Sequence, residues 1–395
     1  MTYDKKMYEE DTSFPRLSIK PEDAPLTEKE RFIFRHGLYA WRDHIKNGYI
    51  EDARRLQARN ASITELPTEV DLNMLYRMFE IRLVLKEGNH ELAEEMLRAE
   101  EADIENANEE NKHHFYYNMG SVYLYRYEYK TALQFYLKAL ELERHVYEKD
   151  AGIYINLAVC YGQLGKYALA IGTLEEACRD YKYDSTSAYR DYIEGLLGVN
   201  YVRTGQVERA KRHISKDLSE LLGNNPNYFA RMAHHNYGCA CWMAKEYEEA
   251  IEYFDKAFRI YKNIDRDYFE NMYWKVRCLI AWGKISEAQK LLSETMSLTE
   301  IDAHYQLALE SLLHLISIES DESIEFIEQK TIPYFVERYE YDRVLEYCEL
   351  LEGIFKRRGS DYKARALKMT TMVCNIVKEM TLGEEVVFDK KSNAC

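Results

Sequence analysis

A repeat of 38 to 40 residues constrains the fold of this chain more than any other feature of its sequence. The repeat is marked by alanines inside amphipathic segments, and successive alanines are separated by 40, 39, 38, 40, 40 and 38 residues. They are Ala53, Ala93, Ala132, Ala170, Ala210, Ala250 and Ala288. A period of this length is typical of stacked structural units that cannot bury their apolar surface alone. The sequence therefore predicts one elongated array over most of its 395 residues.

Each copy has the pattern of two antiparallel helices joined by a short turn. In "YYNMGSVYLYRYEYKTALQFYLKALEL", which begins at Tyr116, Gly120 is followed twelve positions later by Ala132 and then by Tyr136. The small residues mark the closest approach of two helices, and pairs such as Gly165–Lys166 make the turn. With 6 prolines and 17 glycines, the chain has few of the turn signals that a β-sandwich or barrel requires. We therefore expect an all-α, right-handed superhelical solenoid of helical hairpins, with a concave inner wall.

The repeated positions resemble the tetratricopeptide repeat, in which small and aromatic residues recur on both helices. The copy "NYGCACWMAKEYEEAIEYFDKAF" has Gly238, Ala250, Phe254 and Ala257 in these places. The usual period is about 34 residues, so the helices or loops of this chain are longer. Long repeats, 34 tyrosines and an Asn inside the first helix are similar to the bacterial cytoplasmic receptors for secreted signalling peptides (the Rap, NprR, PlcR and PrgX group), most of all the NprR-like branch. The repeats cover about residues 30 to 300.

Four segments are expected along the chain. They are an extended or flexible tail (1–25), the tetratricopeptide-like array (26–300), helical hairpins that cap its apolar end (301–380) and a disordered tail (381–395). Thr27 and Glu30 have the spacing of a capping box, which predicts a helix start at this point.

The resemblance also implies an effector domain, which differs between branches of the family. Its transcription factors carry an N-terminal helix-turn-helix, and we expect none before Glu28. Its phosphatases begin with a three-helix bundle that bears a catalytic Gln, but repeat-like residues already occupy positions 41 to 56. Either the chain is a sensor without an effector domain, or the effector lies outside this sequence.

Asparagines recur on the side of the first helices that is expected to face the concave wall. Asn118, Asn156 and Asn236 each stand two residues before the small residue of their helix, whereas the third copy has Leu196 there and Asn200 one turn later. A carboxamide offers both a donor and an acceptor, so it can pair with the main chain of an extended peptide. The resemblance implies this role for the asparagines. The alternative is that each one bonds to a neighbouring helix.

Arginines and aromatic residues on the first helices are further candidates for peptide binding. Arg82, Arg203 and Arg277 fall at or near inward positions, where a guanidinium could bind a peptide carboxylate. The aromatic candidates are Tyr117, Tyr125, Tyr192, Trp242 and Tyr273. The alternatives are ion pairs within the protein for the arginines and simple packing for the rings.

Composition excludes some classes of partner. The net charge is −15, with 68 acidic and 53 basic residues, which disfavours nucleic acid and favours a cationic partner. The 8 cysteines form no C-x-x-C pair and follow no secretory signal, so we expect reduced thiols and a cytoplasmic location. No apolar run reaches the roughly 18 residues of a membrane helix.

The sequence contains no recognisable catalytic or cofactor motif. It has no dinucleotide-binding, phosphate-binding, H-E-x-x-H or EF-hand pattern. Neighbouring residues on a helix point about 100° apart, so His113–His114, His234–His235 and the Cys239 and Cys241 pair are poor metal chelates. We expect no cofactor, no metal and no catalytic residue.

These features lead to one hypothesis and two alternatives. We expect a quorum-sensing receptor that binds a short secreted signalling peptide on its concave face and acts on an effector or partner by conformational or oligomeric change. The alternatives are a Rap-type phosphatase or anti-activator that acts on a response regulator, and a general scaffold for protein–protein interaction. Family members often dimerise through C-terminal repeats, and residues 332–355 could serve a homodimer or the cap.

Overall fold

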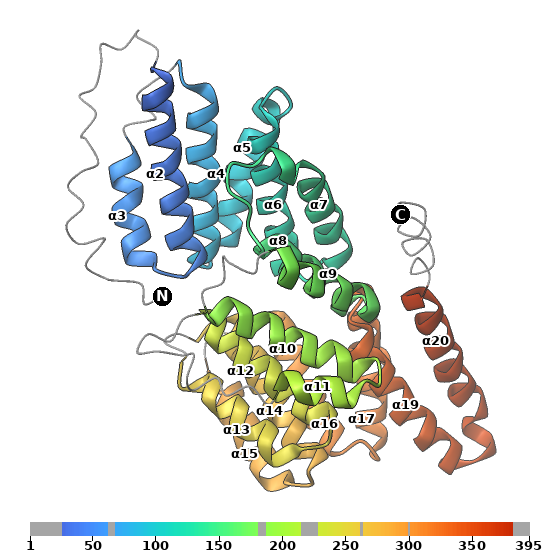
Figure 1. Ribbon diagram of the computed structural model, residues 1–395. Coiled ribbons are helices and arrows are strands. Elements are labelled where there is room, and N and C mark those ends of the chain that lie inside the picture. Colours follow the sequence, from blue (N-terminus) through green and yellow to red (C-terminus); the bar gives the residue numbers. More distant parts are fainter. Residues whose placement is uncertain are drawn as a thin grey trace. The chain divides into compact units, whose positions relative to one another are not determined.

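The computed structural model describes residues 26–61, 68–180, 187–214, 228–260, 264–298 and 301–381. Within these ranges the chain forms helices and no strands, as Figure 1 shows. The predicted all-α solenoid of helical hairpins is confirmed. The tail predicted for 1–25 lies outside the described residues, as does the tail predicted for 381–395 apart from Thr381.

The helices follow one another as hairpins along the chain. The repeat hairpins are α2 (Glu28–Lys46) with α3 (Ile50–Asn60), α4 (Val70–Lys86) with α5 (His90–Ile104), α6 (Glu109–Tyr125) with α7 (Tyr129–Leu142), α8 (Gly152–Gln163) with α9 (Tyr167–Asp180), α10 (Ser187–Arg203) with α11 (Val207–Ile214), α12 (Tyr228–Met243) with α13 (Tyr247–Phe258), and α14 (Arg266–Ala281) with α15 (Ile285–Met296). The later elements are α16 (Ala303–Ile316), α17 (Asp321–Phe326), the π-helix η3 (Ile327–Thr331), α18 (Ile332–Glu337), α19 (Tyr341–Arg358) and α20 (Lys363–Thr381), with short 3₁₀ turns η2 (Glu143–His145) and η4 (Ser360–Tyr362).

The chain divides into two compact units. Unit 1 consists of Met1–Asn118 with His145–Glu148, and unit 2 consists of Met119–Arg144 with Lys149–Cys395. The division falls inside α6, so the repeat array contributes to both units.

The alanines that mark the repeat are the buried contact points of the hairpins. All seven are 0% exposed. The glycines opposite them are equally constrained, because a Cβ on Gly120 would lie 2.7 Å from the ring of Tyr136, and one on Gly238 would lie 2.7 Å from the ring of Phe254. The predicted close approach of the two helices is therefore confirmed at the positions that the repeat indicates.

In every repeat hairpin a residue with positive φ lies two positions after the end of the first helix and five positions before the marker alanine. These residues are Gly48, Gly88, Tyr127, Gly165, Gly205, Lys245 and Gly283, with φ between 63° and 85°. The left-handed conformation lets the backbone close the helix end, as in Glu128 N–H to the Tyr123 carbonyl at 3.0 Å. Tyr339 repeats this corner between α18 and α19, with φ 59°.

Unit 1 has an aromatic core at its first hairpins. Tyr39 and Trp41 of α2 pack against Phe79 of α4, and all three are 0% exposed. The helix start is as predicted, because the Thr27 side chain and the Glu30 side chain cap each other's backbone N–H groups. The predicted capping box is confirmed.

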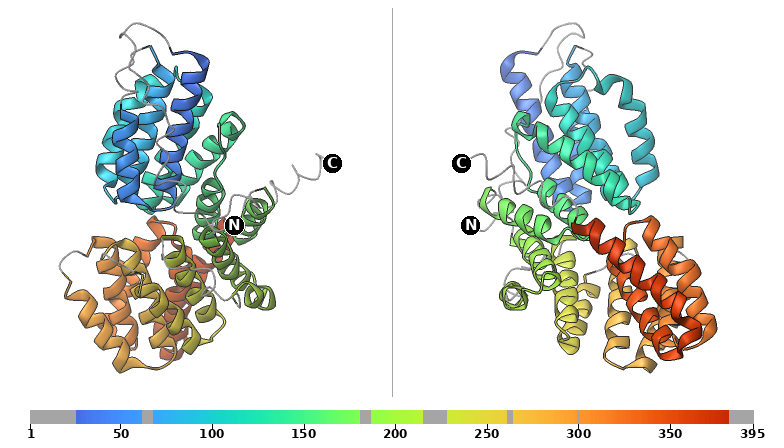
Figure 2. Two further views of the ribbon diagram at one scale, coloured as in Figure 1. Left: turned by 60° about the vertical axis from the view of Figure 1, so that its left-hand side comes forward. Right: turned by 90° about the vertical axis from the view of Figure 1, so that its right-hand side faces the viewer.

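Unit 2 places α10, α12 and α14 side by side and ends in the antiparallel hairpin of α19 and α20 (Figures 1 and 2). Distant segments of the chain meet within it. The ring of Tyr127, at the corner after α6, stacks on His304 of α16 with centroids 3.8 Å apart. Lys166, before α9, donates from Nζ to the Met380 carbonyl of α20 at 3.5 Å. Helical hairpins that are far apart in the sequence are therefore in contact within unit 2. None of the described helices combines the length and apolar character needed to cross a membrane.

Candidate functional site

A cavity inside unit 2 is lined by the first helices α8, α10, α12 and α14 on one side and by the start of α19 on the other. Its volume is about 80 Å³, which is room for two or three water molecules at roughly 30 Å³ each. Its polar lining includes Asn200, Arg203, Asn236, Glu270, Asp342 and Arg343. We call the faces of α10, α12 and α14 that border this cavity the inner wall.

The residue of each first helix that is expected to face the concave wall lies nine positions before the positive-φ residue that follows the helix. We call that positive-φ residue the left-handed corner. In α10, α12 and α14 these positions are Leu196, Asn236 and Trp274, and all three line the cavity. Asn200 lies one turn after Leu196, and Glu270 lies one turn before Trp274; both also line it. The register that selected Asn236 from the sequence therefore faces the cavity. Glu270 lies on the same face of its helix, one turn away from this register, so extending the sequence search by one turn would have identified it.

Asn200 and Asn236 each keep a buried amide atom without a hydrogen bond to any described residue. Asn200 is 3% exposed, and its Nδ2 donates to the Leu196 carbonyl at 2.8 Å, which leaves Oδ1 unpaired. Asn236 is 8% exposed, and its Nδ2 is unpaired. Such a buried group costs about 1–3 kcal/mol, so each one needs a structural or functional reason. These two asparagines thus offer the cavity one free acceptor and one free donor.

The other two asparagines of the predicted series have different surroundings. Asn118 is 0% exposed in unit 1, where its Nδ2 donates to the Met78 carbonyl of α4 at 2.8 Å and its Oδ1 lies 3.5 Å from Arg82 Nε. Asn156 is half-buried in α8. The carboxamide of Asn118 therefore joins two helices of the protein itself, and its role in peptide binding stays a prediction.

The two predicted arginines of unit 2 are each paired with a carboxylate of α19. Arg203 Nη1 lies 2.8 Å from Asp342 Oδ2, and the same carboxylate accepts a hydrogen bond from the Tyr167 hydroxyl. Arg277 forms an ion pair with Glu346. The alternative of an internal ion pair, left open by the sequence, is therefore realised in this conformation.

The remaining predicted site residues pack against neighbouring side chains. Arg82 lies in unit 1 with its guanidinium 4.0 Å from the centroid of the Tyr117 ring. In unit 2, the guanidinium carbon of Arg266 lies 5.2 Å from the ring centroid of Tyr125. Trp242 packs edge-on against Trp274, with ring centroids 5.1 Å apart. The last two aromatic candidates, Tyr192 and Tyr273, are 7% and 0% exposed. None of these residues lines the cavity, and their role in peptide binding stays a prediction.

A charged network at the cavity was not predicted from the sequence. Arg343 of α19 donates from Nη2 to both carboxylate oxygens of Glu270, at 3.2 and 3.1 Å, and its Nη1 lies 3.2 Å from Glu340. Glu270 also accepts from Trp274 Nε1 at 2.8 Å and from the Tyr305 hydroxyl at 3.0 Å. The network joins α14, α16 and α19, so it holds the start of α19 against the inner wall.

The two acids of this network have opposite pKa shifts. Burial would raise the pKa of Glu270, but Arg343 and the indole N–H of Trp274 outweigh it and lower that pKa to about 2. Burial raises the pKa of Glu340 to about 7, and the charge of Arg343 offsets this only in part. Glu270 is therefore ionised at neutral pH, while Glu340 keeps its proton to a higher pH than an ordinary carboxyl.

A Cys–His–Asn arrangement also borders the cavity. Cys239 Sγ lies 3.5 Å from His235 Nε2, and His235 Nδ1 lies 2.9 Å from Asn271 Oδ1. Such a triad is catalytic when the thiol is ionised by the imidazole. Here burial raises the pKa of the Cys239 thiol and lowers the pKa of His235, so both groups are held neutral. The geometry is therefore not that of an activated nucleophile.

One group of potential metal ligands occurs among the described residues: Cys241, Glu246 and Glu249, with ligand atoms within 4.8 Å of one another. A metal requires the thiolate of cysteine. Burial raises the pKa of Cys241, which disfavours that form. The group is better explained as a buried cysteine beside surface acids. In the predicted His113–His114 pair the rings are perpendicular, with centroids 5.0 Å apart.

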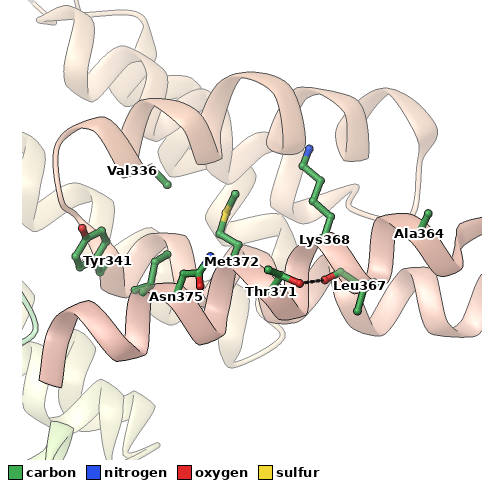
Figure 3. A pocket seen from close by; sticks show the side chains of 9 residues that line it. Val336, Tyr341, Ala364, Leu367, Lys368, Thr371, Met372 and Asn375 are labelled. Carbon is green, nitrogen blue, oxygen red and sulfur yellow. Dashed lines mark hydrogen bonds between the residues drawn. The ribbon is translucent and has the colours of Figure 1, made fainter. Parts of the chain in front are cut away.

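A second and wider opening lies between α18, α19 and α20. Figure 3 shows Val336 near the end of α18, Tyr341 at the start of α19, and Leu367 and Met372 along α20. The opening has a volume of about 610 Å³ and a largely apolar lining. It borders the region 332–355, for which the sequence suggested a homodimer contact. That contact stays a prediction.

Comparison with known proteins agrees with the repeat. Residues 113–182 and residues 232–264 each match the tetratricopeptide repeat family. The transcriptional activator NprA of Geobacillus stearothermophilus is 25% identical over 290 residues, which is 68% of this chain and 69% of NprA.

Solved structures with the same fold include members of the group named from the sequence. NprR in complex with its cognate peptide NprX has a TM-score of 0.68 and 17% identity, covering 87% of this chain and 99% of NprR. A Rap protein complexed with competence and sporulation factor has a TM-score of 0.71 and 16% identity, covering 88% of this chain and 98% of the Rap protein. The chain carries tetratricopeptide repeats, and the resemblance to NprR and Rap proteins is confirmed.

Proposed function

We propose that this tetratricopeptide-repeat protein is a cytoplasmic regulator that binds a short signalling peptide along the inner wall of unit 2. The observation that carries the proposal is the pair of unpaired amide atoms, Asn200 Oδ1 and Asn236 Nδ2, in one cavity. They lie on adjacent helices, because α10 packs directly against α12.

An acceptor beside a donor is complementary to the main chain of a peptide, in which every unit has one N–H and one C=O. Asn200 would accept from a peptide N–H, and Asn236 would donate to a peptide carbonyl. The bound peptide then removes the cost of two buried unpaired groups, which is about 1–3 kcal/mol for each. Because these two asparagines would contact only the main chain of the peptide, selection of one peptide sequence must depend on contacts with the peptide's side chains.

The comparisons support this class of function. The homologue NprA is a transcriptional activator, and the fold neighbours NprR and a Rap protein have been solved in complex with signalling peptides. The site proposed here rests on Asn200 and Asn236.

The conformation of unit 2 in this structure indicates how peptide binding would be transmitted to another protein. The cavity of about 80 Å³ is too small for a peptide, so a peptide must favour a more open state. Helices α14, α16 and α19 move together if they move, because Arg343, Glu270 and Tyr305 join them. A change of this kind in unit 2 could alter the binding of an effector or partner protein, or self-association.

The test is capture from a library of random linear heptapeptides with free termini. Bound peptides are separated with the protein by gel filtration, identified by mass spectrometry and titrated calorimetrically. We expect defined peptides to bind the wild type and to bind the double variant N200A/N236A at least tenfold more weakly. A matched control is Asn89→Ala, which removes a carboxamide from a helix cap at the start of α5. No capture, or equal affinity in the double variant, would exclude the proposal.

A dephosphorylation assay distinguishes the phosphatase alternative from the proposed function. A phosphorylated response regulator incubated with the protein would lose its phosphoryl group faster if the alternative were correct. We expect no acceleration. The scaffold alternative predicts instead that no short peptide is captured at all.

A further inference from the structure

One edge of α19 supplies the carboxylates that neutralise Arg203, which lines the cavity, and Arg277, which lies one turn beyond Trp274 on α14. Asp342 pairs with Arg203, and Glu346 pairs with Arg277. The two acids are four residues apart, so they lie one turn from each other on the same side of the helix. We call Asp342 and Glu346 the acidic edge.

The two arginines are also held in place by aromatic rings. The guanidinium of Arg203 lies 5.3 Å from the ring centroid of Tyr167, and that of Arg277 lies 4.6 Å from Trp242 and 4.7 Å from Trp274. Their side chains are only 11% and 4% exposed. A guanidinium that is so deeply buried requires an anionic partner. Arg203 and Arg277 are therefore two preformed sites for carboxylates in unit 2.

The acidic edge is less deeply buried than the arginines that it neutralises. The side chains of Asp342 and Glu346 are 26% and 30% exposed. A partly exposed carboxylate can turn into water at little cost. If another carboxylate takes its place, no buried charge is left unpaired. The same turn widens the cavity, because Asp342 forms part of its lining.

We propose that the acidic edge is an internal substitute for the ligand, and that the ligand is an anionic peptide whose carboxylates replace those of Asp342 and Glu346. This inference rests on the proposed function and adds to it the charge of the peptide and the step that admits it. Because the net charge of the chain is −15, attraction at long range is unfavourable, so recognition depends on direct contact with Arg203 and Arg277.

The geometry of the acidic edge also sets the spacing of the carboxylates. Side chains four residues apart on a helix have Cβ atoms about 5–6 Å apart. In an extended peptide, alternate residues point to the same side and are roughly 6.5 Å apart. The matching ligand is therefore an extended peptide with acidic residues at positions i and i+2.

The inference is tested with the probe acetyl-Gly-Glu-Ser-Glu-Gly-amide, titrated calorimetrically into the full chain. We expect the double variant D342N/E346Q to bind the probe about tenfold more tightly than the wild type, because more of the protein is then competent to bind. Adding Arg203→Gln to the double variant should abolish the gain. The matched control is Glu349→Gln, which removes an exposed carboxylate from the same helix and should leave the affinity unchanged.

Two results would overturn the inference. One is equal or weaker binding of the probe by D342N/E346Q; the other is equal binding of the counterpart peptide in which both Glu are Gln. Circular dichroism checks the fold, and if the double variant is unfolded, the single variants are used, each with an expected gain of about threefold. If the heptapeptide library yields peptides without acidic enrichment, this inference fails while the proposed function stands. If it yields none, both fail.

Discussion

Asn118 in unit 1 and Asn236 in unit 2 occupy the same position of the repeat, nine residues before a left-handed corner, but they serve different ends. The Nδ2 atom of Asn118 donates to the Met78 carbonyl, whereas that of Asn236 has no partner among the described residues. The repeat therefore determines which side of the helix the carboxamide faces. The neighbouring helix determines whether the protein uses it internally.

Buried carboxylates show the same difference between the units. Glu110 in unit 1 accepts from the Tyr39 hydroxyl at 2.7 Å and from the Tyr147 N–H at 2.9 Å, and it pairs with Arg35. Glu340 in unit 2 is 5% exposed, and its Oε1 accepts no hydrogen bond from a described residue. Glu110 is therefore fully paired, while Glu340 keeps an unpaired oxygen and lines the cavity. Unit 1 also has buried polar atoms without a partner among the described residues, such as Asn111 Oδ1, so the binding site is placed in unit 2 because Asn200 Oδ1 and Asn236 Nδ2 belong to residues that line one cavity.

The largest expected effect is on the network that holds α19 in unit 2. Arg343→Met leaves Glu270 and Glu340 without their shared cation, so we expect the free energy of unfolding to fall by about 3–5 kcal/mol. Urea unfolding followed by circular dichroism measures the change. The matched control is Arg357→Met, since the pair of Arg357 with Glu319 is exposed on both sides and should contribute less than about 1 kcal/mol. A loss from Arg343→Met no larger than that of the control would show that α19 is not held by this network.

The next effect is a pH dependence that Glu340 contributes to unit 2. Its pKa is raised from 4.5 to about 7, so between these pH values the folded carboxyl keeps a proton that the unfolded one has released. Raising the pH through this window must therefore lower the free energy of unfolding, by about 3 kcal/mol at 1.36 kcal/mol per pKa unit.

The matching variant is Glu340→Gln, which cannot titrate. Buried histidines such as His234 and His304, with pKa values lowered to about 4 and about 2, change stability in the opposite direction below pH 6.5. Their contributions cancel when the variant is compared with the wild type at each pH. We expect the stability of Glu340→Gln relative to the wild type to increase from pH 4.5 to 7 and then to level off. A difference that does not change with pH would show that Glu340 keeps its ordinary pKa.

A smaller effect separates the two asparagines directly. Asn118→Ala removes a buried hydrogen bond to the Met78 carbonyl and leaves a small void, so we expect a loss of about 2 kcal/mol. Asn236→Ala removes an unpaired donor and keeps the Cβ that packs against Gly195, so we expect a change within about 0.5 kcal/mol. Thermal unfolding of both variants provides the comparison. Equal losses would mean that Asn236 has an internal partner as good as that of Asn118.

Much of the fold could be predicted because its constraints recur along the chain. A helix contact that admits only a small residue recurs in every hairpin, so Ala132 and Ala250 were recognisable without a structure, and both are 0% exposed. The corner at Gly165 was signalled in the same way, by the glycine of the pair Gly165–Lys166. The inward register of the first helices follows from these two signals, and Asn236, which this register selected, lines the cavity.

The contacts made across unit 2 could not be predicted from such local signals. Tyr167 and Asp342 are 175 residues apart in sequence and meet because small rotations accumulate from one hairpin to the next. The ion pairs of Arg203 and Arg277 with the acidic edge depend on the same accumulated rotation between hairpins. The internal bond of Asn118 depends on the neighbouring helix, because the partner is a backbone carbonyl of α4 that any residue could supply.

The smallest expected effect concerns the corners, which also differ between the units. Unit 1 has glycine at both of its corners, Gly48 and Gly88, whereas Lys245 in unit 2 adopts φ 64° with a side chain. An L-residue is strained in this conformation, so we expect Lys245→Gly to stabilise the protein by about 1 kcal/mol. The reverse change, Gly205→Ala, meets no atom within 4 Å of the added Cβ, so it should cost a similar amount through backbone strain alone. Thermal unfolding of the two variants should therefore give shifts of opposite sign. If Lys245→Gly instead destabilises the protein, the flexibility that glycine adds to the unfolded chain outweighs the relief of strain, and the lysine corner of unit 2 is as favourable as the glycine corners of unit 1.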